Sequence, residues 1–185
     1  MSISASTILN RVNQITKFDE TDIDEILKEV LIEISVRSKY LKSSTTGTLS
    51  ADTDTISNPS DMVQDGVDEL YLDSDLLSIM SFADWRANKV KGYAQRGDYI
   101  YVRPTPNTDK SYTLYYSKKH ASSTTVEYPD EFQSAIVWGC VYKLYDNYSM
   151  QDEANNAETK YERELAKLTP SEGVTISRIP NNTRI

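Results

Sequence analysis

The chain contains one cysteine and one histidine, and these two side chains limit the chemistry that it can perform. A single cysteine cannot form a disulfide within the chain, and Cys140 lies in the apolar run 135–141, which predicts a buried, unreactive thiol. One histidine cannot supply a zinc site of the usual cysteine and histidine types. A Ser–His–Asp or Cys–His device would have to use His120, whose Lys, Ser and Thr neighbours are typical of a surface loop. We therefore expect no preorganised general base there.

Carboxylates between residues 61 and 75 are the second group that could do chemistry. This segment contains five Asp and one Glu, and paired carboxylates can bind a divalent cation or act in acid–base catalysis. A small metal-dependent hydrolase or nuclease that uses Asp65 and Asp68 is therefore one hypothesis. No spacing in the segment orients these groups, so an acidic loop is the favoured interpretation. The six glycines are isolated, and no phosphate-binding loop, G-x-S-x-G or H-E-x-x-H motif is present. The sequence thus favours a non-enzymatic protein without a metal or cofactor.

Basic and aromatic residues alternate between residues 85 and 96, the one segment that could contact a phosphate backbone. Its members are Trp85, Arg86, Lys89, Lys91, Tyr93 and Arg96. The whole chain, however, has 28 Asp and Glu against 20 Lys and Arg, a net charge of -8, which disfavours nonspecific DNA binding. A solvated loop is the favoured interpretation of this basic segment.

Length and composition indicate a folded protein with one domain. The chain has 185 residues, of which 38% are hydrophobic and 26% charged, as in ordinary folded proteins. No apolar run approaches the roughly 18 residues that a membrane span requires. Thirteen tyrosines against three phenylalanines suit surfaces that are half-buried against a neighbour, or a tyrosine-rich sheet.

Apolar residues at helical spacing predict two helices near the N-terminus. The first is a short amphipathic helix over about 4–16, with Ser4 or Ser6 as its N-cap. The second runs over about 21–39 and opens with Thr21 and Asp24, spaced like a capping box.

Two more helices are predicted after residue 128. One opens at Pro129-Asp130-Glu131 and is apolar nearly all round, so it should be central. The other is a charged helix over about 152–168 with an apolar seam that includes Tyr161 and Leu165. We expect the core between these helices and the second helix to include Ile26, Val30, Ile34, Ile136, Cys140 and Leu144.

Between residues 62 and 120 the period becomes alternating, which predicts a small, mostly antiparallel sheet. Runs 99–103 and 112–116 are predicted to form a hairpin whose connection contains Pro104. Residues 70–72 can add a strand, and 76–82 fit either a strand or a helical turn. The preceding segment 41–61 is rich in Ser, Thr and Asp and predicts an exposed loop or loose hairpin, a candidate mobile arm.

The last segment, 169–185, has strand propensity but no neighbour in sequence with which to pair. Val174, Ile176 and Ile179 provide apolar positions, and the segment carries two arginines and one glutamate. It is either an arm that adds a strand to a partner or a disordered terminus.

The order of these elements resembles that of the head-to-tail connector, or adaptor, proteins of tailed bacteriophages. Four stretches carry the resemblance, which covers about residues 5–168. They are Thr21-Asp-Ile-Asp-Glu-Ile-Leu27 in a helix, Gly97-Asp-Tyr-Ile-Tyr-Val-Arg-Pro104 and Tyr112-Thr-Leu-Tyr-Tyr116 in strands, and Tyr128-Pro-Asp-Glu-Phe132 at a helix start.

The resemblance implies an α+β fold and a structural role in the virion. The fold would be a connector domain, 1–168, with a helical bundle core (1–40 and 129–168), an inserted antiparallel β region (62–120) and the exposed loop 41–61. An extended C-terminal tail, 169–185, would follow. Many copies would be assembled in the host cytoplasm into a ring, commonly twelve-fold, in the neck beneath the portal. Packaged DNA would pass through without specific binding, and a downstream neck or tail protein would bind the other side.

Within this hypothesis the tail docks on the portal and tyrosines contact neighbouring subunits. The expected portal-binding residues are Val174, Ile176, Arg178, Ile179 and Ile185. The candidate subunit-interface residues are Tyr161, Leu165, Tyr99, Tyr101 and Tyr115. Another neck or tail ring component, such as a tail terminator, is the alternative function.

Overall fold

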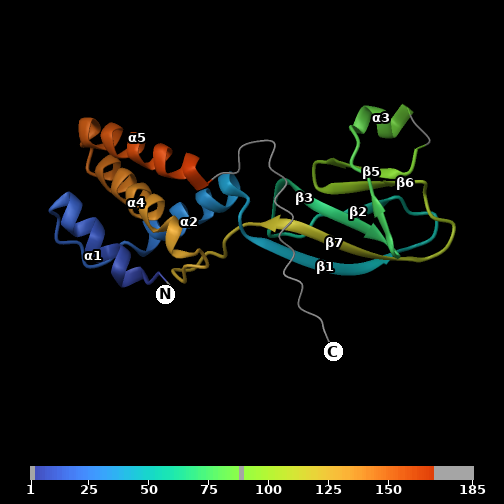
Figure 1. The fold of residues 1–185 in the computed structure, drawn as a ribbon, viewed down its shortest axis with the longest axis horizontal. Coiled ribbons are helices and arrows are strands. Elements are labelled where there is room, and N and C mark those ends of the chain that lie inside the picture. The colour runs from blue at the N-terminus through green and yellow to red at the C-terminus, as the bar shows by residue number, and fades with distance from the viewer. Residues whose placement is uncertain (1–2, 88–89, 169–185) are drawn as a thin grey trace.

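In the part of the chain that the structure describes, four α-helices gather at one end of the molecule, and the strands lie at the other end together with one short helix (Figure 1). The computed structural model describes residues 3–87 and 90–168. We call residues 3–41 and 119–168 the helical lobe, and residues 42–118 the β lobe. The mixed α+β class with an inserted antiparallel β region is thus confirmed. The predicted tail, 169–185, lies outside the described residues.

The helical lobe contains the helices predicted from apolar spacing. They are α1 (Ala5–Thr16), α2 (Asp24–Ser38), α4 (Gln133–Asn147) and α5 (Gln151–Leu168), with a 3₁₀ turn, η1 (Asp130–Phe132), before α4. Ser4 caps α1 as predicted, because its side chain accepts a hydrogen bond from the Thr7 amide. The predicted cap at Thr21 is wrong, since α2 begins at Asp24, whose amide donates to the Asp22 side chain.

Helix α4 is the central element of the helical lobe, as its nearly uniform apolarity predicted. It packs against α1, α2 and α5, and Ile136 and Cys140 are fully buried. Gly139 permits a close approach: a Cβ there would lie 2.8 Å from Val30 Cγ1 and 3.1 Å from the Tyr161 ring. Of the predicted core residues, only Ile26 is half-buried, at the edge of the core.

Two antiparallel sheets pack face to face in the β lobe. The four-stranded sheet has the order β1-β7-β3-β4 and the three-stranded sheet has the order β2-β6-β5. The strands are β1 (Lys42–Leu49), β2 (Thr55–Ser57), β3 (Met62–Leu72), β4 (Asp75–Leu77), β5 (Gly92–Arg96), β6 (Tyr99–Arg103) and β7 (Lys110–Lys118). Their inner faces enclose a core of Leu49, Ile56, Met62, Leu70, Leu77, Tyr93, Ile100, Val102, Leu114 and Tyr116. A short helix, α3 (Phe82–Ala87), packs against β5 on the outside.

The predicted hairpin between 99–103 and 112–116 is wrong, although both strands exist. β6 pairs with β2 and β5, whereas β7 pairs with β1 and β3. The Pro-containing connection therefore crosses from one sheet to the other. Alternation of apolar and polar residues identifies a strand and its buried face. Which strand pairs with it depends on how the two sheets pack.

The prediction of an exposed loop over 41–61 is also wrong, because this segment forms β1 and β2. β1 is an eight-residue edge strand that pairs along its length with β7. Its inner face carries small residues that lie beneath larger ones: a Cβ on Gly47 would meet the Tyr112 ring. Ser and Thr occupy both faces, so the sequence lacks the apolar alternation of a half-buried strand. The adjoining acidic segment is likewise strand β3 and not a loop.

The junction between the lobes contains His120, which is 3% exposed and not in a surface loop. Its amide donates to Ser35 Oγ at 2.9 Å, and its ring stacks on Tyr128. The two ring nitrogens lie 2.6 Å from the Ala121 carbonyl oxygen and 2.9 Å from that of Thr125. The imidazole therefore holds this connection together, and the backbone amide of His120 attaches it to α2.

Candidate functional site

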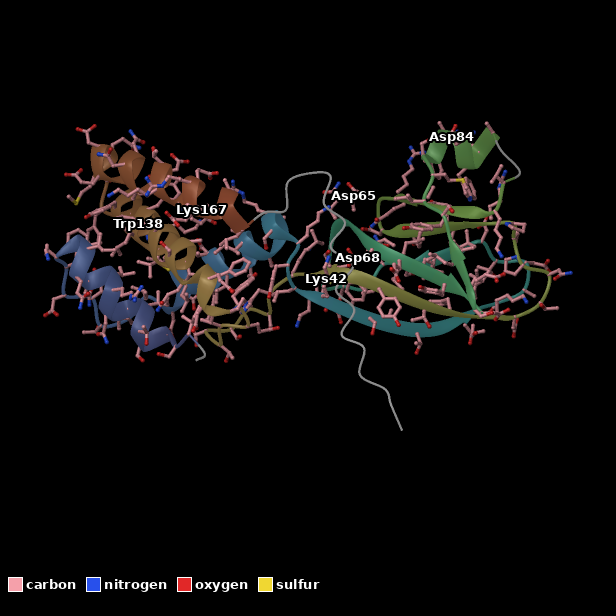
Figure 2. The ribbon with its side chains drawn as sticks, viewed as in Figure 1. Lys42, Asp65, Asp68, Asp84, Trp138 and Lys167 are labelled. Carbon is pink, nitrogen blue, oxygen red and sulfur yellow. The ribbon has the colours of Figure 1, made fainter. Side chains whose placement is uncertain are left out.

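Two carboxylates, Asp68 on β3 and Asp73 in the following turn, pair with lysines. Lys42 lies beside Asp68 (Figure 2), with Nζ 2.8 Å from Oδ1. Lys110 binds Asp73 at 2.8 Å, and its hydrogen bond is the main reason that the pKa of Asp73 is lowered. Within residues 3–87 and 90–168, no cluster of three or more His, Cys, Asp or Glu could hold a metal ion. The structure thus does not bring Asp65 and Asp68 into a metal site.

The single thiol is part of the packing of the helical lobe. Cys140 is fully buried, and desolvation raises its pKa to about 12. A thiol that stays protonated is neither a nucleophile nor a metal ligand at neutral pH. The prediction that this cysteine is buried is therefore confirmed, and the raised pKa agrees with low reactivity.

The outer face of the four-stranded sheet is rich in tyrosine and threonine. We call it the tyrosine face, and its members are Ser44, Thr46, Glu69, Tyr71, Leu76, Thr113 and Tyr115. The neighbouring positions on β3 and β7 point inward to the core, which places these residues on the opposite side. No described helix lies over this row, which leaves Tyr115 44% and Leu76 56% exposed.

Contacts within the tyrosine face hold its side chains in place. The rings of Tyr71 and Tyr115 meet edge to face with centroids 6.1 Å apart. The Tyr71 hydroxyl donates to Glu69 Oε2 at 3.1 Å, and this bond is the main cause of the raised pKa of Tyr71. Glu69 is therefore an oriented carboxylate beside two aromatic rings.

The outer face of the three-stranded sheet has a different composition, dominated by arginine and aromatic rings. We call it the arginine face: Arg96, Tyr99, Tyr101 and Arg103 on β5 and β6, with Phe82 and Trp85 on α3. Ile100 and Val102 alternate with these β6 residues and point into the core. Figure 1 shows α3 on the side of the β lobe away from β1 and β7. The arginine face and the tyrosine face thus point in opposite directions.

Stacking organises the arginine face. The rings of Phe82 and Trp85 are stacked with centroids 5.3 Å apart. The guanidinium of Arg96 lies 4.5 Å from the centre of the Phe82 ring, and that of Arg103 lies 4.7 Å from the centre of the Trp85 ring. Tyr101 contacts both α3 rings from below. Stacking of this kind covers the plane of the Arg96 guanidinium and leaves its N–H edge to bind an oxygen acceptor.

Of the five candidate interface residues, three lie on these faces and two do not. Tyr99 is 47% exposed on the arginine face, Tyr101 is half-buried there, and Tyr115 belongs to the tyrosine face. Tyr161 and Leu165 are each 1% exposed, so they pack inside the helical lobe and are unavailable at its surface. The seam of α5 completes the core of its own chain.

The basic segment is divided by the fold. Arg86 and Arg96 lie outside, Lys91 binds Asp75, and Tyr93 is buried in the core. Lys89 lies outside the described residues, as do the candidate portal-binding residues Val174, Ile176, Arg178, Ile179 and Ile185. Sequence reasoning missed Glu69 and Arg103, because only the strand register places them on the outer faces.

Comparison with known proteins gives one family. A family model described as SU10 adaptor protein matches residues 3–183, nearly the whole chain. A search of curated proteins with this chain found no match. In the described part of the chain, no helix combines the length and apolarity that a membrane crossing demands.

Proposed function

The chain belongs to the SU10 adaptor protein family of structural, non-enzymatic phage proteins, and on this premise we propose that it forms a ring joining the portal vertex to the tail. In this role it is a component of the virion neck, at the interface of head and tail. Twelve copies per ring are the expected number. One side of the ring binds the portal and the other binds a downstream neck or tail protein.

The observation that carries the ring proposal is the pair of opposite, chemically different outer faces on the β lobe. A closed ring of identical subunits uses a heterologous interface, in which one surface patch binds a different patch on the next copy. Tyr99 and Tyr115 are exposed on the two faces and supply aromatic contact area on both sides. Lateral contacts through these tyrosines agree with the unusual tyrosine content of the chain.

The charge of the chain supports passage of DNA without tight binding. Each fixed contact between a basic side chain and a phosphate adds affinity that depends on salt, so a channel with many such contacts would retain DNA. The net charge of -8 instead repels the phosphate backbone. DNA is thus expected to move through the ring without a specific site.

The portal contact is assigned to the C-terminal segment. The family model extends to residue 183, so the segment with Val174, Ile176 and Ile179 belongs to the matched region. Helix α5, which precedes it, ends next to the C-terminal end of α2, close to the junction of the lobes (Figure 1). In this proposal the alternating apolar residues, with Arg178 and the terminal Ile185, add a strand to the portal.

Native mass spectrometry of the protein alone and after mixing with the portal ring of its phage tests this function. We expect a single large complex. The number of added copies should equal the number of portal subunits in the ring, or be a divisor of that number. A variant that ends at Thr169 should keep its melting temperature and lose portal binding. A wild-type protein that ignores the portal would contradict the proposal. A stable ring of another symmetry would instead favour a tail component such as a tail terminator.

A further inference from the structure

We propose that, within the ring proposed above, the arginine face of each β lobe packs on the tyrosine face of the next copy, with Arg96 against Glu69. This inference rests on the proposed ring and specifies the surfaces and the charged pair of its lateral contact. The partner is a second copy of this chain.

The placement of the two faces suits a head-to-tail contact between copies. The sheets pack through their inner faces, so both outer faces are available at once on a single β lobe. Each copy can therefore bind one neighbour through Arg96 and another through Glu69. An isologous dimer would bring each face against itself and leave like charges opposite one another.

Charge is complementary between the two faces. No ion pair among the described residues includes Arg96 or Glu69. Phe82 covers the plane of the Arg96 guanidinium, and Tyr71 holds the Glu69 carboxylate from one side. Each group is thus oriented, with hydrogen-bonding capacity left for the other. Charge-assisted pairs between an oriented guanidinium and a carboxylate are among the stronger polar contacts in interfaces.

Apolar groups surround the charged pair on both faces. Tyr99 on the arginine face, and Leu76 and Tyr115 on the tyrosine face, each expose between 44% and 56% of their surface. Tyrosine and arginine are enriched where protein interfaces are fully buried, and neighbouring apolar groups exclude water from the polar contact. Each face therefore has the composition of an interface centre.

DNA is the less suitable occupant of the arginine face. The rings of Phe82 and Trp85 stack on each other and on arginines, so their faces are taken and cannot stack on bases. Lys91, in the described residues that follow α3, already binds Asp75. The net charge of -8 further disfavours a duplex, whereas a single oriented carboxylate matches Arg96.

Charge reversal in two separate variants tests the contact. Arg96→Glu and Glu69→Arg each place like charges across every lateral interface, and we expect the yield of complete rings on the portal to fall about tenfold or more. An equimolar mixture of the two variants should restore ring formation, because alternating copies again juxtapose opposite charges. Arg11→Glu, a reversal at an exposed position on α1, is the matched control and should form rings normally.

The outcomes separate this inference from the ring proposal. Melting temperatures of the single variants show whether each one folds. Recovery of ring formation in the mixture is independent evidence that both variants are folded. Normal rings from either single variant, or no recovery in the mixture, would overturn the Arg96–Glu69 contact. If Arg96→Glu forms rings but binds duplex DNA less well than wild type, the arginine face serves DNA and the inference is wrong. A wild-type protein that forms no ring with the portal would overturn the ring proposal itself.

Discussion

Arg37 on α2 binds Glu162 on α5 through the two terminal nitrogens of its guanidinium: Nη1 lies 2.7 Å from Oε1 and Nη2 lies 2.5 Å from Oε2. The same guanidinium lies over the ring of Tyr161 at 5.7 Å. This fork joins the C-terminal end of α2, which leads into the β lobe, to the helix that precedes the C-terminal segment. The contact therefore holds α5 against the C-terminal end of α2.

The first prediction concerns the acid side of the stability profile. The hydrogen bond from Arg37 lowers the pKa of Glu162 below its ordinary value of 4.5. The pair's contribution to the free energy of unfolding is present above about pH 4.5, and it is lost as the pH falls through the lower pKa of Glu162 in the folded state. The side chains are 39% and 48% exposed, so solvent screening limits the pair to roughly 0.5–1 kcal/mol.

Urea unfolding of wild type and Glu162→Gln at pH 7 and pH 3 measures this contribution. We expect Glu162→Gln to be less stable by that amount at pH 7 and nearly equal to wild type at pH 3. Glu153→Gln, an exposed position in the first turn of the same helix, serves as the control. A difference that persists unchanged at pH 3 would show that the carboxylate charge is not the cause.

The second prediction concerns the packing of α4. Gly139→Ala should destabilise the protein by about 1–3 kcal/mol, because the new methyl group would overlap Val30 on α2. In a helix, alanine is otherwise more favourable than glycine by roughly 1 kcal/mol. The expected change in stability is therefore opposite in sign to the change that helix propensity alone predicts. Thermal unfolding of this variant beside Ser134→Ala, a half-buried position in the same helix, measures the effect. A stabilised Gly139→Ala variant would mean that α2 and α4 lie further apart.

The helices could be predicted from the sequence because each one carries its own signal. α4 opens with Pro129 and acids and then presents apolar residues on every side, so its central place follows from composition alone. The seam of α5 was equally visible, but the pattern does not say which surface an apolar seam meets. Tyr161 fills the space beside Gly139 of its own chain, and only tertiary packing decides this.

The pairing of strands and the outer faces of the β lobe could not be predicted in the same way. β1 has Ser and Thr on both faces, and its inner face is covered by side chains of the neighbouring strand β7, such as Tyr112. The sequence of β1 therefore shows no alternation of apolar and polar residues. Arg96 and Glu69 lie on strands of different sheets, and only the register of both sheets shows that they face outward. The tyrosine surplus predicted half-buried surfaces, but it did not locate them.

The third prediction concerns the reactivity of the only thiol. Because burial raises the pKa of Cys140 to about 12, the native protein should not react with a disulfide reagent at pH 8 over minutes. In denaturant the same reagent should titrate one thiol per chain at the ordinary rate. Rapid labelling of the folded protein would mean that α4 opens to solvent on this timescale, contrary to its central position.

The fourth prediction uses the two tryptophans as separate reporters of ring assembly. Trp85 lies on the arginine face, whereas Trp138 lies on α4 in the helical lobe (Figure 2), with Lys160 4.1 Å from the centre of its ring. If the arginine face is covered by a neighbouring copy, Trp85 loses contact with water and its emission shifts to shorter wavelengths. A Trp138→Phe variant, which keeps Trp85, should therefore show a blue shift when the portal is added. The matched Trp85→Phe variant, which keeps Trp138, should change less, because the proposed contact lies in the β lobe. Adding Arg96→Glu to the Trp138→Phe variant should remove the shift, and a shift that survives this reversal would place the covering contact elsewhere on the β lobe.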